Sequence, residues 1–356
     1  MTTCVLHIGS PKTGSSAIQA AVGLPFFQQP FGSWCVVPTK GGRIAGLYRE
    51  PEDLPRVLAQ KQRAHPARFR RKSDRYRALL RRSLQPRWRH PPAAVFLSSE
   101  YLWTFPIEAI DQLRRDLTAI GVSRFVVVAY VRSPSSLYRS SLQQHARLST
   151  AFRRFSPDRW SYRFRLRLEA WHQVFGNDLY VRPFDRQQLH QGCVVKDLRQ
   201  TIQQVCPELE PLPVSLREKA VNESVSLEEL LAMQEFMQRF PAKSEDGSVR
   251  RSRVLWRHWR RLEQLRVGSA VSPVVIHPAV ERIIQQRHQA DLDWLTDAFG
   301  VHLSGPDCSG LALSSGSTSA VESEAVALAD LLEMRTAEPW LQTVRARLSR
   351  CTLPRD

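Results

Sequence analysis

The stretch CVLHIGSPKTGSSAIQAAV, residues 4–22, decides the fold that this sequence predicts. Its first five residues are mostly apolar and predict a buried strand. A loop containing glycine and proline follows, and two serines then lead into a run of helix formers. Strand, glycine-containing loop and helix, in that order, form the opening unit of an α/β nucleotide-binding fold.

The lysine of this loop lies at an unusual position. A Walker A loop reads GxxxxGK[ST], with the lysine directly after the second glycine. Here Gly9 and Gly14 keep the spacing, but Ser15 follows Gly14 and the lysine, Lys12, lies inside the loop. Backbone N–H groups and hydroxyls make phosphate binding the expected use, and a turn with a solvated lysine is the alternative. A central lysine suits a 5′-phosphate carrying one further group better than it suits a triphosphate.

Other apolar runs predict the rest of a sheet. Residues 124–131 form the strongest strand candidate, because a nearly continuous apolar run indicates burial on both faces, as in a parallel sheet. Shorter strands are predicted at 33–38, 93–97 and 179–182, and helices at 107–120, 194–205 and 227–240. We therefore expect an α/β, P-loop-like, three-layer fold with a central parallel sheet flanked by helices.

The predicted organisation is one large domain and a tail. We expect a domain at 1–303 that includes an arginine-rich helical insertion at about 56–90. Residues 304–319 are rich in serine and glycine and predict a linker. The segment 304–356 as a whole is thus predicted to be a linker and a helical C-terminal tail.

The charge balance predicts anionic ligands. Lysine and arginine number 51 against 34 aspartates and glutamates, which gives a formal net charge of +17. Such an excess draws anions in a salt-dependent way without specifying which anion. Arginine clusters are interleaved with Trp88, Trp160, Trp256 and Trp259, a pattern that suits an acidic glycan. Solvated helix faces are the alternative interpretation.

Further features bear on compartment and metals. The six cysteines are scattered without zinc-type spacing, which favours unpaired thiols in a reducing compartment. No apolar stretch is long enough for a membrane span, and the first residues do not read as a signal peptide. The expectation is a cytoplasmic protein without a transmembrane segment.

The loop sequence PKTGSS resembles the 5′-phosphosulfate loop of sulfotransferases that use 3′-phosphoadenosine 5′-phosphosulfate (PAPS). Bacterial and carbohydrate branches of that family commonly write it PKTGTT or PKSGTT, and the serines in this chain keep a hydroxyl at both changed positions. The resemblance implies that the loop binds the donor through Pro11, Lys12, Thr13, Gly14, Ser15 and Ser16.

A second segment resembles the same family. Its members carry Arg-x-Pro at a strand end and a serine eight residues after the arginine, and Arg132 and Ser140 fall on these positions. The resemblance implies that both contact the 3′-phosphate of the donor. Independently of the family, an arginine at a strand end can bind a phosphate with two N–H groups. Residues 171–185 are also similar to a segment of bacterial sulfotransferase-like proteins.

Sulfuryl transfer requires a base for the acceptor and charge stabilisation on the leaving phosphate. Lys12 suits the second role. Glu100, directly after the predicted strand at 93–97, is the candidate base, because the resemblance implies a glutamate in that region. A carboxylate at a helix start is the alternative interpretation of Glu100, and His145 is a second candidate base.

Taken together, the sequence predicts an enzyme that transfers the sulfuryl group of PAPS to an acceptor hydroxyl, with PAP as the product and no metal ion. The resemblance favours a carbohydrate acceptor, which an acidic glycan would satisfy, and no nucleic-acid partner is expected. A P-loop kinase or NTPase, a non-catalytic polyanion-binding protein and an inactive donor-binding relative remain as alternatives. The oligomeric state is left open.

Overall fold

The computed structural model describes residues 1–22, 33–37, 44–49, 54, 56–84, 92–214, 226–239, 272–303, 327–333, 342 and 345–346. The chain divides into two compact units. The first comprises Met1–Arg132, Arg163–Val221 and Ala290–Leu303, and the second comprises Ser133–Tyr162, Asn222–Gln289 and Ser304–Asp356. The predicted linker at 304–319 lies outside the described residues, so the boundary at residue 304 stays a prediction.

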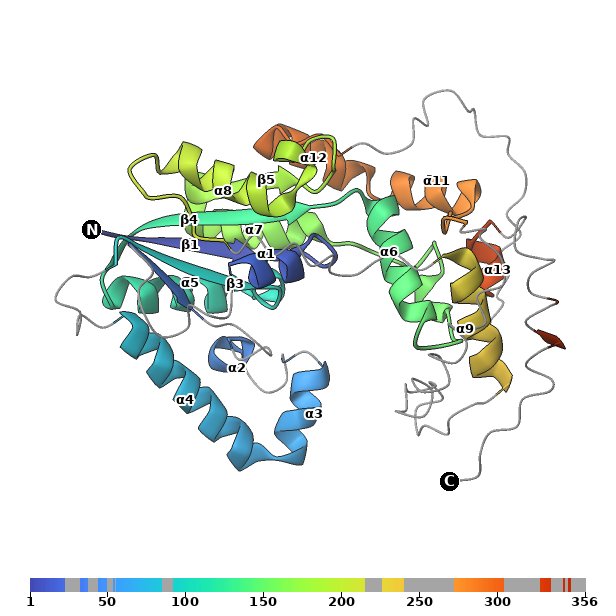
Figure 1. Ribbon diagram of the computed structural model, residues 1–356, viewed down its shortest axis with the longest axis horizontal. Helices are drawn as coiled ribbons and strands as arrows, with labels where there is room; N and C mark the ends of the chain where they lie inside the picture. The colour runs from blue at the N-terminus through green and yellow to red at the C-terminus, as the bar shows by residue number, and fades with distance from the viewer. Residues whose placement is uncertain are drawn as a thin grey trace. The chain divides into compact units, whose positions relative to one another are not determined.

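A five-stranded parallel sheet forms the centre of the first unit (Figure 1). Its strands are β1 (Thr2–Ile8), β2 (Trp34–Val37), β3 (Ala94–Ser99), β4 (Val122–Val131) and β5 (Leu179–Pro183). The strand order is β2-β3-β1-β4-β5, so the chain first builds one side of β1 and then crosses to the other. In open parallel sheets, ligands bind beyond the carboxyl ends of the strands where the order reverses. The predicted parallel sheet is confirmed.

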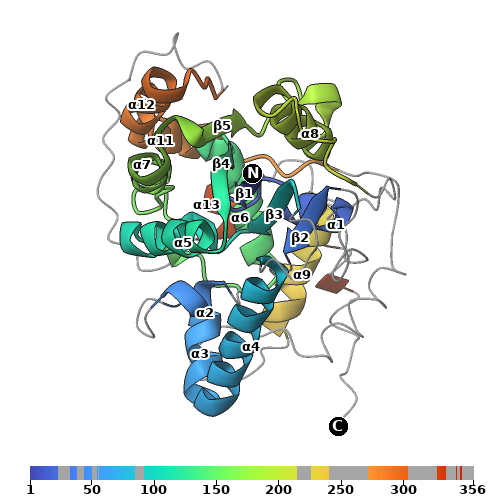
Figure 2. The same ribbon diagram turned by 90° about the vertical axis from the view of Figure 1, so that its left-hand side faces the viewer.

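Helices cover both faces of this sheet. The helices of the first unit are α1 (Ser15–Ala21), α2 (Ala45–Tyr48), α3 (Arg56–Ala64), α4 (Pro66–Leu84), α5 (Ile107–Ala119), α7 (Phe164–Phe175), α8 (Val194–Val205) and α12 (Gln289–Phe299). Figure 2 shows α1 and α8 on one side of the sheet and α5 and α7 on the other. The three-layer α/β fold expected from the sequence is therefore the observed one.

Alternating strand residues build the core beneath α1 and α8. Because successive side chains of a strand point to opposite faces, every second residue of β1, β3 and β4 meets the same two helices. The helices contribute apolar residues at helical spacing to the same cluster. Its members include Val5, Phe96, Val126, Val128, Tyr130, Ile18, Val22, Leu198 and Ile202. Burial of such a side chain stabilises the fold by roughly 1.5–3 kcal/mol.

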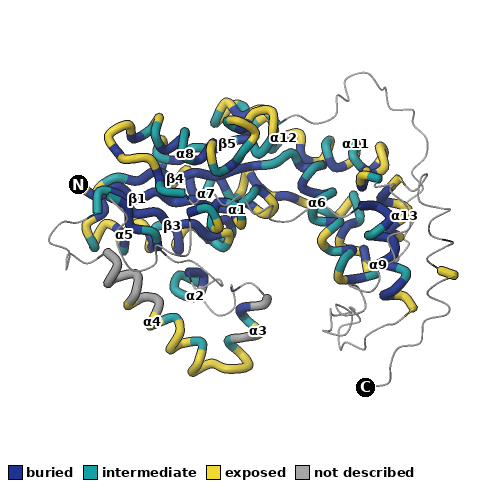
Figure 3. The backbone as a smooth tube through the Cα atoms, in the orientation of Figure 1, coloured by how far each residue is buried: buried dark blue, intermediate teal, exposed yellow. Residues whose placement is uncertain are grey.

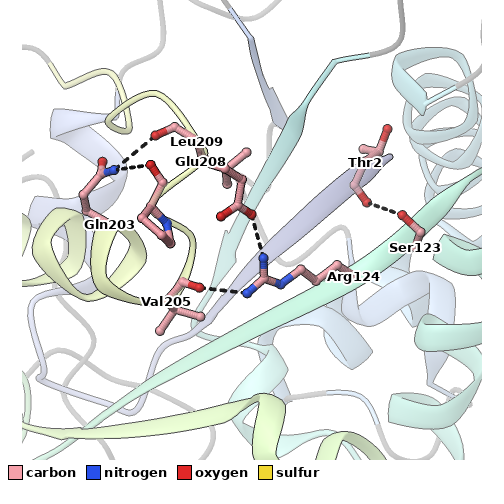
Figure 4. Close-up of polar contacts among 8 residues, drawn as sticks. Thr2, Ser123, Arg124, Gln203, Val205, Glu208 and Leu209 are labelled. Atoms are coloured by element: carbon pink, nitrogen blue, oxygen red, sulfur yellow. Dashed lines mark hydrogen bonds and ion pairs between the residues drawn. The ribbon is translucent and has the colours of Figure 1, made fainter.

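The amino end of β4 is tied to the carboxyl end of α8 (Figure 4). Arg124 donates to the Val205 carbonyl at 2.7 Å and pairs with Glu208 at 2.6 Å. Gln203 donates to the carbonyls of Pro207 and Leu209, at 3.1 and 3.3 Å. These donors satisfy carbonyls at and beyond the last turn of α8, which have no partner within the helix. They fix α8 against the sheet at the edge opposite to the carboxyl ends of the strands.

The arginine-rich segment contains two helices within residues 56–84, while 85–90 lie outside the described residues and the insertion as a whole stays a prediction. Helices α3 and α4 occupy 56–84, and much of their described surface is exposed (Figure 3). Four exposed cations on α4 follow an i, i+3, i+4, i+7 spacing and therefore share one face. We call this face the α4 cationic stripe; it consists of Arg68, Arg71, Lys72 and Arg75.

The second unit is helical. Its described residues form the helices α6 (Pro134–Ala146), α9 (Leu227–Arg239), α11 (Pro278–Arg287) and α13 (Leu328–Leu331). Helix α9 begins with a reciprocal cap, in which Ser226 N–H donates to the Glu229 carboxylate at 3.0 Å and Glu229 N–H donates to Ser226 Oγ at 3.1 Å. The core of the second unit includes four fully buried side chains, those of Tyr138, Leu142, Leu230 and Ile284. Among the residues described in either unit, no helix has both the length and the apolar character needed to cross a bilayer.

Candidate functional site

Four strand ends meet at the carboxyl edge of the sheet in the first unit. The loop 9–14 follows β1, Glu100 follows β3, Arg132 follows β4 and Phe184 follows β5. Parallel pairing aligns Ile8 with Ser99, and Gly9 N–H donates to the Ser99 carbonyl at 3.3 Å. A Cβ atom at Gly9 would lie 3.4 Å from the Cα of Glu100. The proposed base thus leaves the sheet directly beside the loop, and its side chain is exposed.

The loop has a strained backbone at its lysine. Lys12 has φ 62° and Gly14 has φ 79°, both in the left-handed region. Glycine adopts this region without cost, whereas a residue with a Cβ loses roughly 1–2 kcal/mol there. Thr13 is buried and its hydroxyl donates to the Ser10 carbonyl at 2.8 Å, which closes the loop on itself. A strained residue at a strand end is typical of functional loops.

Gly14 is also enclosed from outside the loop. A Cβ atom there would lie 2.9 Å from a ring carbon of Phe184 and 2.9 Å from a methyl carbon of Val194. Both distances are shorter than van der Waals contact, so only glycine fits against these two side chains. Phe184 lies just beyond β5 and Val194 begins α8. The loop is therefore packed against elements that lie far along the chain.

The two serines of the loop differ in environment. Ser15 is buried, and its Oγ points at Gly9, where it would lie 2.1 Å from an added Cβ. Within the described residues this hydroxyl has no hydrogen-bond partner. Ser16 is exposed, as are Pro11 and Lys12. The loop thus carries an exposed cation and a buried hydroxyl that lacks a hydrogen-bond partner among the described residues.

Arg132 contacts the loop directly. Its guanidinium donates to the Lys12 carbonyl at 3.3 Å and lies 5.6 Å from the ring centroid of Phe184. Arg132 and Lys12 are 120 positions apart in the sequence, and each belongs to a different one of the two motifs. The structure therefore brings the PKTGSS loop and the Arg-x-Pro motif together.

The remaining two predicted residues belong to the second unit. Ser140 and His145 lie on α6, and Ser140 is half-buried. His145 Nε2 donates to the Ala151 carbonyl at 2.7 Å, and an Arg154 N–H donates to His145 Nδ1. Burial lowers the pKa of His145, the hydrogen bond to Ala151 raises it and Arg154 lowers it, with a net decrease. Both ring nitrogens are engaged within the unit, while the contact predicted for Ser140 stays a prediction.

Asp197 is a buried acid of the first unit that no sequence motif marks. It lies in the first turn of α8 and is fully buried. Its carboxylate accepts from Arg182 at 2.8 and 3.2 Å, from Tyr130 Oη at 2.8 Å and from His190 N–H at 3.0 Å. Burial alone would raise the pKa of Asp197, but these hydrogen bonds outweigh it and lower that pKa. The only sequence signal was an aspartate near the start of an otherwise apolar helix face.

A second buried polar group lies under the same sheet face. His7 is fully buried in β1, and its Nδ1 is 2.8 Å from Ser98 Oγ. Gln19 of α1 donates to the same hydroxyl at 3.3 Å. Burial lowers the pKa of His7 to about 3, so the imidazole is neutral at physiological pH. His7 joins β1, β3 and α1 below the loop.

Comparisons with known proteins found solved structures of low similarity. No protein-family model matches the chain, and no curated protein matches it. A sulfotransferase from Alicyclobacillus acidocaldarius is 12% identical with a TM-score of 0.42, covering 84% of this chain and 96% of that one. The sulfotransferase domain of the Synechococcus PCC 7002 olefin synthase is 14% identical with a TM-score of 0.30, covering 81% and 94%. At this level of similarity, function has to be argued from the residues of the site.

Proposed function

We propose that this chain is a sulfotransferase that moves the sulfuryl group of PAPS to an acceptor hydroxyl. The observation that supports this most is the hydrogen bond from Arg132 to the Lys12 carbonyl. It joins two motifs that resemble the two donor-binding segments of one enzyme family. Both lie at the sheet edge where parallel α/β folds bind ligands.

In this proposal the donor is bound at both of its phosphate ends. The backbone N–H groups and hydroxyls of residues 11–16 hold the 5′-phosphosulfate, with Lys12 beside its bridging oxygen. Arg132 binds the 3′-phosphate, and Ser140 adds a second donor there. An arginine is suited to this role because its planar guanidinium binds two phosphate oxygens at once.

The proposed reaction is an in-line displacement at sulfur. The acceptor oxygen forms a bond to sulfur while the bond from sulfur to the bridging oxygen breaks, and PAP leaves with that electron pair. The Lys12 ammonium stabilises the charge that develops on the leaving phosphate, and Glu100 accepts the acceptor's hydroxyl proton. The proposal places one cationic side chain at each phosphate end of the donor and invokes no metal ion.

For the acceptor we propose a carbohydrate hydroxyl, with an acidic glycan as the favoured polymer. The α4 cationic stripe supports this choice, because it places four exposed cations on one helix face in the same unit as the loop. A polymer carrying carboxylates or sulfates would gain attraction at each of these positions.

Ligand-dependent thermal unfolding tests the donor assignment. A ligand that binds only the folded state raises the midpoint of unfolding. We expect PAP to stabilise the protein more than ADP or Mg-ATP does, and Arg132→Ala to remove the advantage of PAP over ADP. Arg115→Ala serves as the control, because Arg115 is exposed on α5 and pairs there with Asp111. A larger shift with Mg-ATP, or no shift with PAP, would exclude the proposed donor.

A further inference from the structure

The strained loop needs neighbours that enforce its conformation. Left-handed backbone at a residue with a Cβ persists only where the surrounding structure over-determines it. The loop's own contribution is the hydrogen bond from Thr13 to the Ser10 carbonyl. The rest comes from outside: Phe184 and Val194 close on Gly14, and Arg132 holds the Lys12 carbonyl.

Phe184 and Val194 lie far along the chain from the loop, so their position beside it depends on tertiary packing. Phe184 comes two residues after Arg182, directly beyond the end of β5, and packs against the core cluster that contains Tyr130 and Val194. Val194 is the first residue of α8, three residues before Asp197 and therefore on a neighbouring part of the helix surface. What fixes β5 relative to α8 consequently fixes the two side chains that contact Gly14.

Asp197 makes this connection. Its carboxylate binds Arg182 of β5 through two N–H groups, Tyr130 of β4 through the hydroxyl, and the His190 N–H in the segment between β5 and α8. Asp197 has no exposed surface, whereas the side chain of Arg182 is 35% exposed. The arrangement depends on the charge of this carboxylate. Loss of that charge would leave buried donors without an acceptor.

We propose that Asp197 is a positioning residue of the donor site, acting through Phe184 and Val194 on the loop that carries Lys12. This inference deepens the proposed function and rests on it, because it assigns the donor as the ligand that the positioned loop binds. Phe184 also supports Arg132 through its ring, so the same network positions both phosphate-binding groups.

The test compares PAP affinity with stability in three variants. Asp197→Asn keeps the shape but replaces one acceptor oxygen by an NH₂ group that faces the donors of Arg182 or Tyr130. Tyr130→Phe removes one donor and leaves the carboxylate charged. Leu113→Ala is the matched control, because Leu113 is fully buried on α5, at the other face of the sheet.

We expect the dissociation constant for PAP, measured by titration calorimetry, to rise about tenfold or more in Asp197→Asn, as for other residues that orient binding groups. Tyr130→Phe should raise it less, and Leu113→Ala should leave it unchanged while lowering the unfolding midpoint. Equal PAP affinity in wild type, Asp197→Asn and Tyr130→Phe would overturn the inference. If Asp197→Asn does not fold, the comparison of Tyr130→Phe with Leu113→Ala decides.

Amide hydrogen exchange separates this inference from the proposed function. Without any ligand, we expect faster exchange in a peptide covering residues 9–22 for Asp197→Asn and Tyr130→Phe than for wild type and Leu113→Ala. If wild type fails to bind PAP, the proposed donor is wrong, and exchange alone shows whether Asp197 positions the loop. Unchanged exchange in both variants would contradict the positioning role whatever the ligand.

Discussion

Lys12 combines a costly backbone conformation with the one ammonium group of the loop 9–14. Its φ of 62° is a conformation that glycine adopts freely and lysine does not. Gly14, two residues on, also has a left-handed backbone, but there the residue is glycine, and no side chain would fit between Phe184 and Val194. A lysine at the strained position is therefore better explained by its charge than by the stability of the loop.

Replacement of Lys12 should separate stability from donor binding. We expect Lys12→Gly to be more stable than Lys12→Ala by about 1 kcal/mol. Glycine avoids the Cβ penalty of the left-handed backbone, but it also raises the entropy of the unfolded chain, which cancels part of the gain. Both variants should lose PAP binding, since both lack the ammonium. Urea unfolding gives the stability difference and calorimetry the affinity. Equal stability of the two variants would show that the Cβ penalty at this position is no larger than the unfolded-state entropy that glycine adds.

At the scale of single elements, β1 contains a buried histidine whose protonation is shifted to low pH. His7 joins β1 to β3 through Ser98, and Gln19 brings α1 to the same hydroxyl. A charged imidazole at this fully buried position would lack solvation, which is why burial lowers the pKa of His7 to about 3. The strand that precedes the loop is thus sensitive to acid.

This environment predicts a pH dependence with a defined sign. In the unfolded chain a histidine has a pKa near 6.5, so between pH 6.5 and about 3 the unfolded state binds a proton that the folded state does not. His7 should therefore reduce the free energy of unfolding as pH falls from 6.5, by up to about 1.4 kcal/mol per pH unit. Urea unfolding at pH 7, 6 and 5 should show a shallower decline in His7→Gln. Parallel curves for the two proteins would refute the assignment.

The elements show what the sequence could and could not predict. The apolar run at 124–131 predicted a buried parallel strand, and it lies within β4; the helix predicted at 194–205 is α8. The motif residues of the loop and Arg132 were singled out by their motifs, and the structure places Arg132 against the loop, while their roles stay predictions. Asp197 was not, because its side-chain partners lie 15 and 67 residues away and no local pattern marks them. The contact of Phe184 with Gly14 depends likewise on the strand order.

The distribution of charge is the main feature at the scale of the whole molecule. Residues 56–84 carry eleven lysines and arginines and one aspartate, a net charge of +10 within a total of +17. Like charges three and four residues apart on one helix repel each other. An anionic polymer bound along the α4 cationic stripe would relieve this repulsion.

A salt gradient on immobilised heparin distinguishes a localised site from overall charge. We expect the fourfold serine variant of the α4 cationic stripe to elute at markedly lower salt than wild type, because four adjacent charge contacts are lost together. The control removes four exposed cations from other elements: Arg115, Arg159, Arg186 and Lys196. If the two variants elute together, the attraction comes from net charge and the stripe is no binding site.

The central position of β1 affects how the protein is made. Its partners β3 and β4 begin at residues 94 and 122, so the strand pairs only with segments synthesised much later. At about 5–20 residues per second, translation needs roughly 6–25 seconds to proceed from β1 to the end of β4. Throughout that time an apolar strand has an unpaired edge, which is a site for aggregation or for chaperone binding. Strand β1 is enclosed on both sides only when β3 and β4 have both paired with it.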